Sequence, residues 1–553
     1  MKRLKISNSV TQSQLAWVLL VIIMLVYATE ISYQTLLRYD TFKATAFDLG
    51  NMDQVLWNTI HGRLFQFTNQ GADWYGPPTR LAIHFEPIIL PLSLLYLFHA
   101  DPRILLVFQT LALVAGALPV FLLTRKYLPE WPLLAPCMVV AYLLSPALLG
   151  LNLFDFHPVS LATPLLLYAV LALTYRRYGW FITACIFAAA CKEDVPLAIA
   201  MFGILVIWYY KLPRLGTALL LGGLCWSLLA FLVIIPHFYP GAQHNNYWYR
   251  YEELGSSPGV ALVNILFHPW LLFTTFITLD RLYYLFGLFR SSGFLSLLAP
   301  EWLLPALPSL AVNLLSTDSL LYSGVYHYNA TIIPFVILAA IHGTRRLIVL
   351  WRGWRGEKEV QQRYGAEQRW PLAVIARLCV VVAPYSLQWQ RLRKGMELQW
   401  QRFGQRMEPL ARSMPMARLQ VAVGGWIVSM LLLNYIVSIP LLNIFWADHT
   451  PGSREQHIQQ LLARIPPDAS VSAGGNLNPH LTERLYITVF PEITFSSSEK
   501  SINNVVEYVV VDINALFPED RVSTSDKLNQ LVSSGQFRIL ARAEGVILLV
   551  RRT

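Results

Sequence analysis

The stretch Leu15–Tyr27 reads LAWVLLVIIMLVY. A helix that crosses a bilayer needs about 20 apolar residues, so this run and its neighbours predict a first membrane span over roughly 14–37. The segment before it, MKRLKIS, resembles the start of a signal peptide, but Glu30, Tyr33 and Arg38 follow the apolar run in place of a small-residue cleavage site. We therefore expect an uncleaved helix that enters the membrane from the cytoplasm.

The composition places much of the remaining chain in a membrane as well. Of the 553 residues, 55% are hydrophobic and 14% are charged, and the mean hydropathy is +0.45. Soluble domains carry about 25% charged residues, so a soluble core could not bury this much apolar surface. Further spans are predicted at 103–124, 132–150, 158–174, 179–194, 195–210, 215–236, 283–315 (one or two helices), 329–343 and 421–445. The fold class expected is mainly α, a polytopic transmembrane bundle of about 9–11 spans.

The net charge of +10 is concentrated in one segment. Residues 343–420 hold 15 Lys or Arg and 5 Asp or Glu, which accounts for the whole excess. Because this segment borders membrane helices, it is typical of a cytoplasmic loop that faces anionic lipid, and no nucleic-acid partner is expected. With 346–420 and the shorter basic loops placed inside, the loops that face outside are 38–102, 151–157, 237–282 and 316–328.

A small soluble domain is predicted at the C-terminus, over residues 451–553. Acidic and basic residues balance there, and helical patterns alternate with strand-like runs such as 505–511, which favours a small α/β domain. A last span at 421–446 would place this domain on the extracytoplasmic side. The apolar stretch 371–385 would reverse that placement if it crossed, but its central Arg377 makes it a poor span.

Ionisable residues recur at the predicted outer ends of the spans. Asp48 and Asp53 lie on an amphipathic helix over 47–61 that we expect to rest on the membrane interface. A carboxylate at such a boundary can act as a general base or a metal ligand. The five-residue spacing puts the two acids on different faces, so they need not act together. The alternative for Asp48 is that it caps the helix.

Two further acid and imidazole pairs are candidates. His84 and Glu86 stand at the start of a short apolar helix, 85–98, where they could bind a cation or an acceptor hydroxyl. Asp155 and His157 lie two residues apart in a short outer turn, a spacing that suits metal binding or proton transfer. For each pair the alternative is a set of solvated residues at a helix start or turn.

The triplet Lys192, Glu193 and Asp194 interrupts the apolar stretch 181–210. Charges at such a place are costly unless they are paired or lie at a helix end. The triplet therefore marks either an outer turn that joins the same cavity or a structural ion pair.

Cations among aromatic rings complete the candidate set. The loop YWYRYEE at 247–253 places Arg250 among four aromatic residues, which suits a sugar by stacking and a phosphate by charge. The alternative is an interfacial aromatic belt. His327 and Tyr328 belong to the same outer surface, and Arg290, within a predicted span, could meet a lipid phosphate or extend to the interface.

Several short motifs together carry a family resemblance. They are FDLG at 47–50, WNT at 57–59, HFEP at 84–87, FHP at 156–158, CKED at 191–194 and PHL at 479–481. In these motifs the chain resembles a bacterial family of predicted membrane proteins, domain of unknown function 2079. The resemblance covers about 38–345 and, more loosely, 451–553, while the basic stretch 350–420 departs from it and looks like an insertion.

That family is in turn distantly similar to the GT-C glycosyltransferases, such as the aminoarabinose and protein mannosyl transferases. The shared layout is one span, a large outer loop with an early acid, two surface helices and then short-looped spans. The resemblance implies a GT-C-like architecture for residues 1–345, including loop 38–102, and a polyprenyl-phosphate sugar donor used at the outer face of the inner (plasma) membrane. The chain lacks the Lys-Pro-Pro-Leu type sequence of the aminoarabinose enzymes and has HFEP there, which leaves the acceptor open.

By this analogy Asp48 is the catalytic base of a glycosyltransferase. The residues expected to bind substrate are Asp53, His84, Glu86, Lys192, Glu193, Asp194, Arg250, His327 and Tyr328. A divalent metal ion is a further expectation, with Asp155 and His157 as its ligands. We expect these side chains to gather in one partly desolvated pocket, because a solvated carboxylate is a weak base.

Two other functions remain open at this stage. A transporter or flippase would use the charges within spans to line a path, although the sequence shows no inverted repeat. A non-catalytic envelope scaffold would use the C-terminal domain, where Asp512 ends a predicted strand at a position that often faces a ligand. No nucleotide-binding loop is present in the sequence, which argues against an ATP-driven pump.

Overall fold

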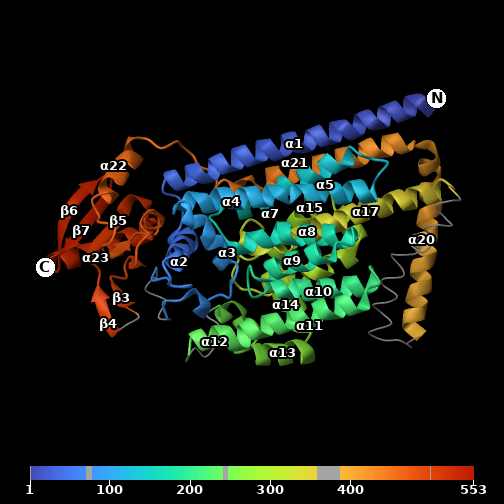
Figure 1. Cartoon of the computed structure of the whole chain (residues 1–553). Helices are drawn as coiled ribbons and strands as arrows, with labels where there is room; N and C mark the ends of the chain where they lie inside the picture. Colours follow the sequence, from blue (N-terminus) through green and yellow to red (C-terminus); the bar gives the residue numbers. More distant parts are fainter. Residues whose placement is uncertain (1, 70–76, 241–246, 358–386, 498–499, 553) are drawn as a thin grey trace.

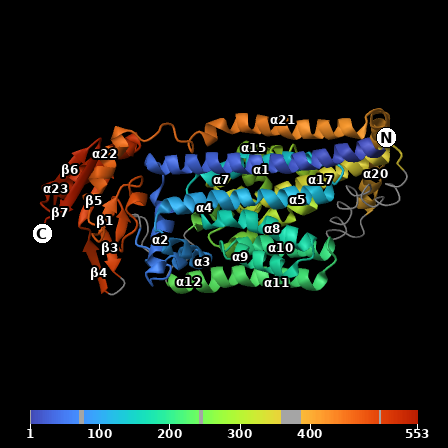
Figure 2. The same cartoon turned by 45° about the horizontal axis from the view of Figure 1, so that its top comes forward.

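The computed structural model describes residues 2–69, 77–240, 247–357, 387–497 and 500–552. Most helices run side by side in one bundle (Figure 1). A domain built around a β-sheet stands at one end of the bundle, and α20 (Leu387–Ser413) stands at the other end with the N-terminus. The turned view in Figure 2 shows the same arrangement. We call the end of the bundle with the β-sheet domain the sheet end, and the end with α20 and the N-terminus the basic end.

Within the described residues, five helical segments are long and apolar enough to cross a membrane. They are Thr11–Asp40 in α1 (Lys2–Asp40), Pro102–Tyr127 (α4 Pro102–Ala115 and α5 Ala117–Tyr127), Pro213–Phe238 (α11 Pro213–Leu229 to α12 Ile235–Phe238), Ile333–Trp354 (α17) and Met416–Leu442 (α21). Proline is the first residue of α4 and of α11, and Pro415 directly precedes α21. Proline suits these positions because the first backbone N–H groups of a helix have no partner within the helix.

Other apolar helices are bent or short. Two bent pairs would raise the number of spans to seven: α6 (Leu134–Leu143) with α7 (Pro146–Leu153), at 47°, and the segment Trp248–Phe267, which includes α13 (Pro258–Phe267), with α14 (Trp270–Phe276), at 107°. The shorter ones are Pro158–Thr174 with α8 (Ala162–Thr174), α9 (Tyr178–Ala189) and α10 (Val195–Trp208). The predicted total of about 9–11 spans is reached only if these bent and short helices also cross.

Glycine allows a close contact between two helices of the bundle. A Cβ atom on Gly203 of α10 would lie 2.5 Å from the backbone oxygen of Gly216 on α11, and the reverse distance is also 2.5 Å. Any larger residue would push the two helices apart. Because lipid tails are as apolar as leucine, close backbone packing of this kind is what holds helices together in a membrane.

Two predicted spans differ from the structure. The region 283–315 is not one or two regular helices but a series of pieces, because Gly293 adopts φ +60° and Pro305 lies inside a 3-10 segment. The pieces are α15 (Leu279–Arg290), 3-10 turns at Leu295–Leu298 and Pro300–Ala306, and α16 (Leu307–Leu314). The span predicted at 329–343 begins at Ile333 and continues to Trp354, since Arg346 pairs with Glu301 instead of ending the helix.

The helix predicted over 47–61 does not rest on an open interface. It consists of a π-helical turn, Ala46–Gly50, followed by α2 (Asn51–Ile60), and most residues of α2 are buried. The reason is that the sheet domain covers it: Gln54 Nε2 donates to the backbone oxygen of Arg484 at 3.1 Å. The apolar segment after Pro87 is short and broken, as expected, with α3 (Ile89–Ser93) and a 3-10 turn at Leu94–Leu97.

The sheet domain has a mixed five-stranded sheet in the order β2-β1-β5-β7-β6. Strand β1 pairs in parallel with β2 and β5, whereas β7 pairs antiparallel with β5 and β6. A separate hairpin joins β3 and β4. The bounds are α22 Ser453–Leu462, β1 Val471–Ala473, β2 Ile487–Val489, β3 Thr494–Ser497, β4 Lys500–Val505, β5 Tyr508–Asp512, α23 Pro518–Ser533, β6 Phe537–Ala543 and β7 Val546–Arg551.

The sheet domain is held against the first long loop by buried polar contacts. Thr68 accepts a hydrogen bond from the Ile487 backbone at 3.0 Å, and Asn69 and Asn478 exchange side-chain hydrogen bonds at 2.9 and 2.7 Å. The sheet domain and loop 38–102 therefore lie at the same end of the bundle. The stretch 371–385 lies outside the described residues.

Candidate functional site

The centre of the candidate site is a contact between Asp48 and His157. Asp48, in the π-helical turn before α2, places Oδ1 3.0 Å from His157 Nε2 and accepts a hydrogen bond from Thr45 Oγ1 at 2.9 Å on Oδ2. His157 follows α7, where its backbone N–H donates to Gln109 Oε1 at 3.0 Å. An ionised carboxylate only accepts, so Nε2 donates. His157 Nδ1 is buried and has no hydrogen-bond partner in the described part of the chain.

The surroundings of Asp48 favour its ionised form. Burial opposes ionisation, but His157, Thr45 and Arg80 together outweigh it and lower the pKa of Asp48. The side chain is 26% exposed, so one edge of the carboxylate remains open. Asp48 is therefore a proton acceptor that is always available near neutral pH, although a lowered pKa makes it a weaker base than the partly desolvated group the sequence led us to expect.

Asp155 supports the turn that carries Asp48. Its Oδ2 accepts from the Thr45 backbone N–H at 2.8 Å and from Thr45 Oγ1 at 2.7 Å, and Arg38 Nε lies 3.8 Å from Oδ1. The carboxylate is 1% exposed and its oxygens are already used. Among the described residues no three His, Cys, Asp or Glu side chains gather as a metal ion would require. The metal ion expected at Asp155 and His157 stays a prediction.

A second acid and imidazole pair lies nearby. His84 Nδ1 lies 2.8 Å from Glu193 Oε1, and Glu193 Oε2 accepts from the Phe85 backbone at 3.1 Å. Burial opposes ionisation of Glu193, but His84 and Lys192 lower its pKa to about 2. Glu86, predicted to bind substrate, instead forms a buried two-point ion pair with Arg80, with Nε to Oε2 at 2.7 Å.

The triplet at 192–194 forms the turn between α9 and α10. A turn was one of the two interpretations that the sequence left open. Lys192 is half-buried, and its side chain makes no hydrogen bond or ion pair with any described residue. Burial opposes its charge, but Asp194 and Glu193 raise the pKa of Lys192, so the ammonium persists. Asp194 Oδ1 is buried without a hydrogen-bond partner among the same residues. This turn therefore holds charge that a ligand could neutralise.

Arg250 supplies a second cation beside this turn. Its Nε lies 3.1 Å from Asp318 Oδ2, and its guanidinium carbon lies 4.6 Å from the Tyr247 ring and 5.9 Å from the Tyr328 ring. The His84 ring is stacked 5.6 Å from the Tyr247 ring. Rings and cation together form a surface of the kind that binds sugar faces and phosphate oxygens.

Stacked rings join the two acid and imidazole pairs. His157 and His327 stack at 3.9 Å between ring centroids, and His327 lies 4.2 Å from Tyr328. Burial, with help from His157 and Lys192, lowers the pKa of His327 well below its usual value, so this imidazole is neutral. We call the connected set the site row; it runs in order through Asp48, His157, His327, Tyr328, Arg250, Tyr247, His84 and Glu193.

Asp53 is not part of the site row. It lies on the far face of α2, where Tyr96 Oη and Thr482 Oγ1 both donate to it at 2.5 Å. Burial raises the pKa of Asp53 to about 7, against the opposing effect of these two hydroxyls. The structure therefore does not bring Asp53 together with the other predicted substrate-binding residues: it lies at the contact with the sheet domain.

The sequence analysis did not single out three residues of the site. Thr45 links Asp48 to Asp155, and Arg80 neutralises Glu86; neither lies in a pattern that singles it out. Gln109 did carry a signal, because an amide inside a predicted span needs partners. Its Nε2 donates to the Asp155 backbone oxygen at 2.8 Å, and its Oε1 holds the His157 backbone.

Two crystal structures of ArnT from Cupriavidus metallidurans are similar to the chain. The one bound to undecaprenyl phosphate has a TM-score of 0.46 at 14% identity, and the apo structure has 0.44 at 12% identity; in both cases 96% of this chain and 97% of the other are covered. No curated protein matches the chain.

A family model described as "Predicted membrane protein (DUF2079)" matches residues 38–388 and 410–548. The match continues through most of the basic stretch 350–420, so that stretch is not an insertion as a whole; the part left unmatched is 389–409. The model covers most of the chain and agrees with its apolar helices. This multi-pass membrane protein belongs to the DUF2079 family of predicted membrane proteins.

Proposed function

We propose that the protein is a membrane glycosyltransferase that moves a sugar from a polyprenyl-phosphate donor to a hydroxyl acceptor. The observation that carries the proposal is the contact between Asp48 and His157 at 3.0 Å, within one cluster that also holds Lys192 and Arg250. The cluster therefore offers a proton acceptor and cations for a phosphate in one place. It lies at the end of the helical bundle that contacts the sheet domain.

The order of the elements agrees with the glycosyltransferase resemblance. A long first helix, α1, ends at Asp40, and the acid Asp48 follows shortly after it. The short helices α2 and α3 come next, before the span that begins at Pro102. This similarity of layout is analogy and supports the reaction class only in combination with the site chemistry.

The reaction is a single displacement at the anomeric carbon. Asp48 accepts the proton of the acceptor hydroxyl while that oxygen forms a bond to the anomeric carbon. The bond between that carbon and the phosphate oxygen breaks, and its electron pair leaves with the polyprenyl phosphate. His157 donates to Asp48 and fixes the orientation of the carboxylate. Attack opposite to the leaving group inverts the anomeric configuration.

The leaving phosphate gains negative charge as its bond to the sugar breaks. Lys192 has no competing ion pair within the described residues, and Arg250 lies over the neighbouring rings. Cations that are already in place stabilise such charge without reorganisation, and this is commonly the largest single contribution to catalysis. In this proposal Lys192 and Arg250 bind the phosphate, and Tyr247 and Tyr328 contact the sugar.

The proposed location is the outer face of the inner membrane. The basic segment 346–420 is placed in the cytoplasm, following the rule that Lys and Arg are retained inside. Loop 38–102 and the sheet domain, which contact each other, then lie outside together. In a variant without the five native cysteines, labelling of Asp526→Cys and Arg412→Cys with a membrane-impermeant thiol reagent tests this: only Asp526→Cys should react in intact cells.

The substitution Asp48→Asn tests the function itself. Purified wild-type protein in liposomes should transfer labelled sugar from undecaprenyl-phosphate sugars to extracted envelope acceptors, and Asp48→Asn should abolish transfer while inserting and folding normally. Asp526→Asn, the same change at an exposed position of α23, is the matched control and should keep full activity. Full activity of Asp48→Asn would rule out the proposed base.

A transporter would give a different result in the same liposomes. Movement of the lipid-linked sugar across the bilayer without any covalent change would contradict the transferase proposal and favour a flippase. The site row gathers at the sheet end, whereas a transport path would need polar groups along the depth of the bundle.

A further inference from the structure

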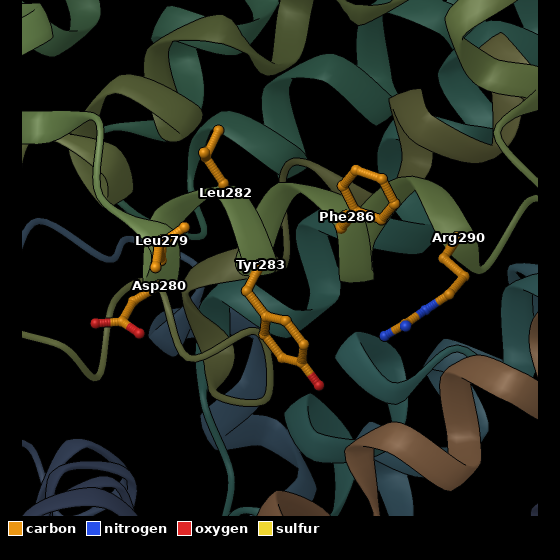
Figure 3. Close-up of a pocket in the computed structure, with 6 residues that line it drawn as sticks. All are labelled: Leu279, Asp280, Leu282, Tyr283, Phe286 and Arg290. Atoms are coloured by element: carbon orange, nitrogen blue, oxygen red, sulfur yellow. The ribbon is translucent and has the colours of Figure 1, made fainter.

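A hollow of about 440 Å³ lies on α15, and none of its lining residues belongs to the site row. It is lined by Leu279, Asp280, Leu282, Tyr283, Phe286 and Arg290 (Figure 3). The apolar side chains are exposed, with Leu279 at 84% and Phe286 at 60%. Large exposed apolar side chains on a helix of a membrane protein face lipid. The hollow therefore opens to the bilayer.

The hollow lies beside a membrane span. Helix α15 packs along α21, because Asn434 Nδ2 donates to the Gly287 backbone oxygen at 2.9 Å and Trp426 Nε1 donates to the Gly293 backbone oxygen at 2.9 Å. Arg290 is the last residue of α15, but it lies beside Asn434, an interior residue of the span α21, and therefore within the thickness of the bilayer.

Arg290 carries a charge at this lipid-facing hollow, and some of its side-chain N–H groups have no hydrogen-bond partner among the described residues. The residue is 8% exposed, and only its Nε has a hydrogen-bond partner among the described residues, Asn434 Oδ1 at 2.9 Å. The terminal nitrogens are left for the hollow. An arginine inside a membrane is costly unless its donors are satisfied, and an anionic group in the hollow would satisfy them.

Tyr283 adds a second donor on the same side. The guanidinium carbon of Arg290 lies 5.9 Å from the Tyr283 ring, and Figure 3 shows both side chains reaching into the same space. The Tyr283 hydroxyl has no hydrogen-bond partner within the described chain. Asp280, three residues earlier on the helix, is a near neighbour of Tyr283 and contributes a carboxylate to the same hollow.

We propose that this hollow binds a zwitterionic phospholipid with an ammonium head group, of the phosphatidylethanolamine class. The phosphodiester accepts hydrogen bonds from Arg290 and Tyr283, the ammonium meets Asp280, and the acyl chains lie along Leu282 and Phe286. A phosphate monoester such as a polyprenyl phosphate carries nearly two negative charges, which Asp280 repels and a single arginine does not neutralise. One cation and one acid match a phosphodiester with one ammonium. This site is independent of the proposed transferase activity.

The test is lipid binding to the purified full-length protein, measured by native mass spectrometry after delipidation. The probes are dioleoyl-phosphatidylethanolamine, dioleoyl-phosphatidylglycerol and undecaprenyl phosphate. Wild type should retain phosphatidylethanolamine most strongly. Arg290→Gln should weaken its binding at least tenfold, since a charged partner is lost, and Tyr283→Phe about threefold to tenfold.

The remaining variants separate charge matching from general lipid affinity. Asp280→Asn should lower phosphatidylethanolamine binding and raise phosphatidylglycerol binding. Arg418→Gln, at the basic end of α21, removes one exposed arginine outside the hollow and should change nothing. Tyr283 is half exposed, so Tyr283→Phe keeps the test valid even if Arg290→Gln fails to fold.

Two results would overturn the proposal. Equal phosphatidylethanolamine binding by wild type and Tyr283→Phe would show that the hollow does not hold the head group. Stronger binding of phosphatidylglycerol or undecaprenyl phosphate than of phosphatidylethanolamine, lost on Arg290→Gln, would assign the hollow to a different lipid.

Discussion

His157 Nε2 lies 3.0 Å from Asp48 Oδ1, although 109 positions separate the two residues in the chain. The first prediction follows from this contact. In His157→Ala, burial of Asp48 is no longer offset by the imidazole, so the pKa of Asp48 rises and the carboxylate protonates at a higher pH. The acid limb of the pH profile of kcat should therefore move to higher pH, and kcat at neutral pH should fall by about 10²-fold or more.

The conservative variant His157→Gln provides the control. Its amide can donate to Asp48 as Nε2 does, so it should recover part of kcat and return the acid limb toward lower pH. A pH profile that is the same in wild type, His157→Ala and His157→Gln would contradict a positioning role for His157.

The second prediction concerns Lys192. Lys192→Gln should lower kcat/KM for the polyprenyl-phosphate donor at least tenfold, because the ammonium proposed to bind the phosphate is lost. Lys192→Arg should retain more activity, since the charge is kept. Steady-state kinetics with the donor varied measures both values. An unchanged kcat/KM in Lys192→Gln would remove this residue from the donor site.

The third prediction concerns the contact between Asn69 and Asn478. Asn69 Nδ2 donates to the Ala46 backbone oxygen at 3.0 Å as well as to Asn478, so the sheet domain braces the turn that carries Asp48. Asn478→Ala leaves buried polar groups of Asn69 without a partner, which should destabilise the protein by about 1–3 kcal/mol. The apparent Tm in detergent and the rate of transfer should both fall; an unchanged Tm would contradict the bracing role.

The fourth prediction concerns pH and the interface at Asp53. Burial raises the pKa of Asp53 from 3.8 to about 7, so the folded protein binds this proton more tightly than the unfolded chain. The resulting stabilisation is complete below pH 3.8 and is lost as pH rises through about 7, at up to about 1.4 kcal/mol per pH unit. The apparent Tm of wild type should therefore fall over this window.

Asp53→Asn should flatten this dependence without removing it. Glu483, in the same interface, also has its pKa raised by burial, to about 8, and continues to titrate in the variant. A Tm that falls equally steeply in Asp53→Asn and in wild type would show that Asp53 does not retain its proton on folding.

Some of the site could be predicted because single charges in apolar surroundings have few allowed positions. Lys192, Glu193 and Asp194 had to be either paired or at a helix end, and the structure places them at the turn between α9 and α10. The different directions of Asp48 and Asp53 follow from helix geometry, and the structure confirms them.

Other features depend on contacts between distant parts of the chain. The amphipathic pattern at 47–61 is the same whether its polar face meets water or the sheet domain, so sequence alone could not show that Gln54 contacts Arg484. The stack of His157 on His327 depends likewise on how the helices pack. The irregular backbone after α15 could have been predicted from the sequence, since glycine and proline, here Gly293 and Pro305, both interrupt regular helices.

The central claim is that the cluster at the sheet end binds a lipid-linked phosphate next to Asp48. A cryo-electron microscopy structure of the wild-type protein with undecaprenyl phosphate tests it most directly. We predict that the phosphate contacts Lys192 and Arg250, with open space between it and the Asp48 carboxylate for a sugar and an acceptor. A phosphate bound elsewhere, with the site row unchanged and empty, would contradict the claim.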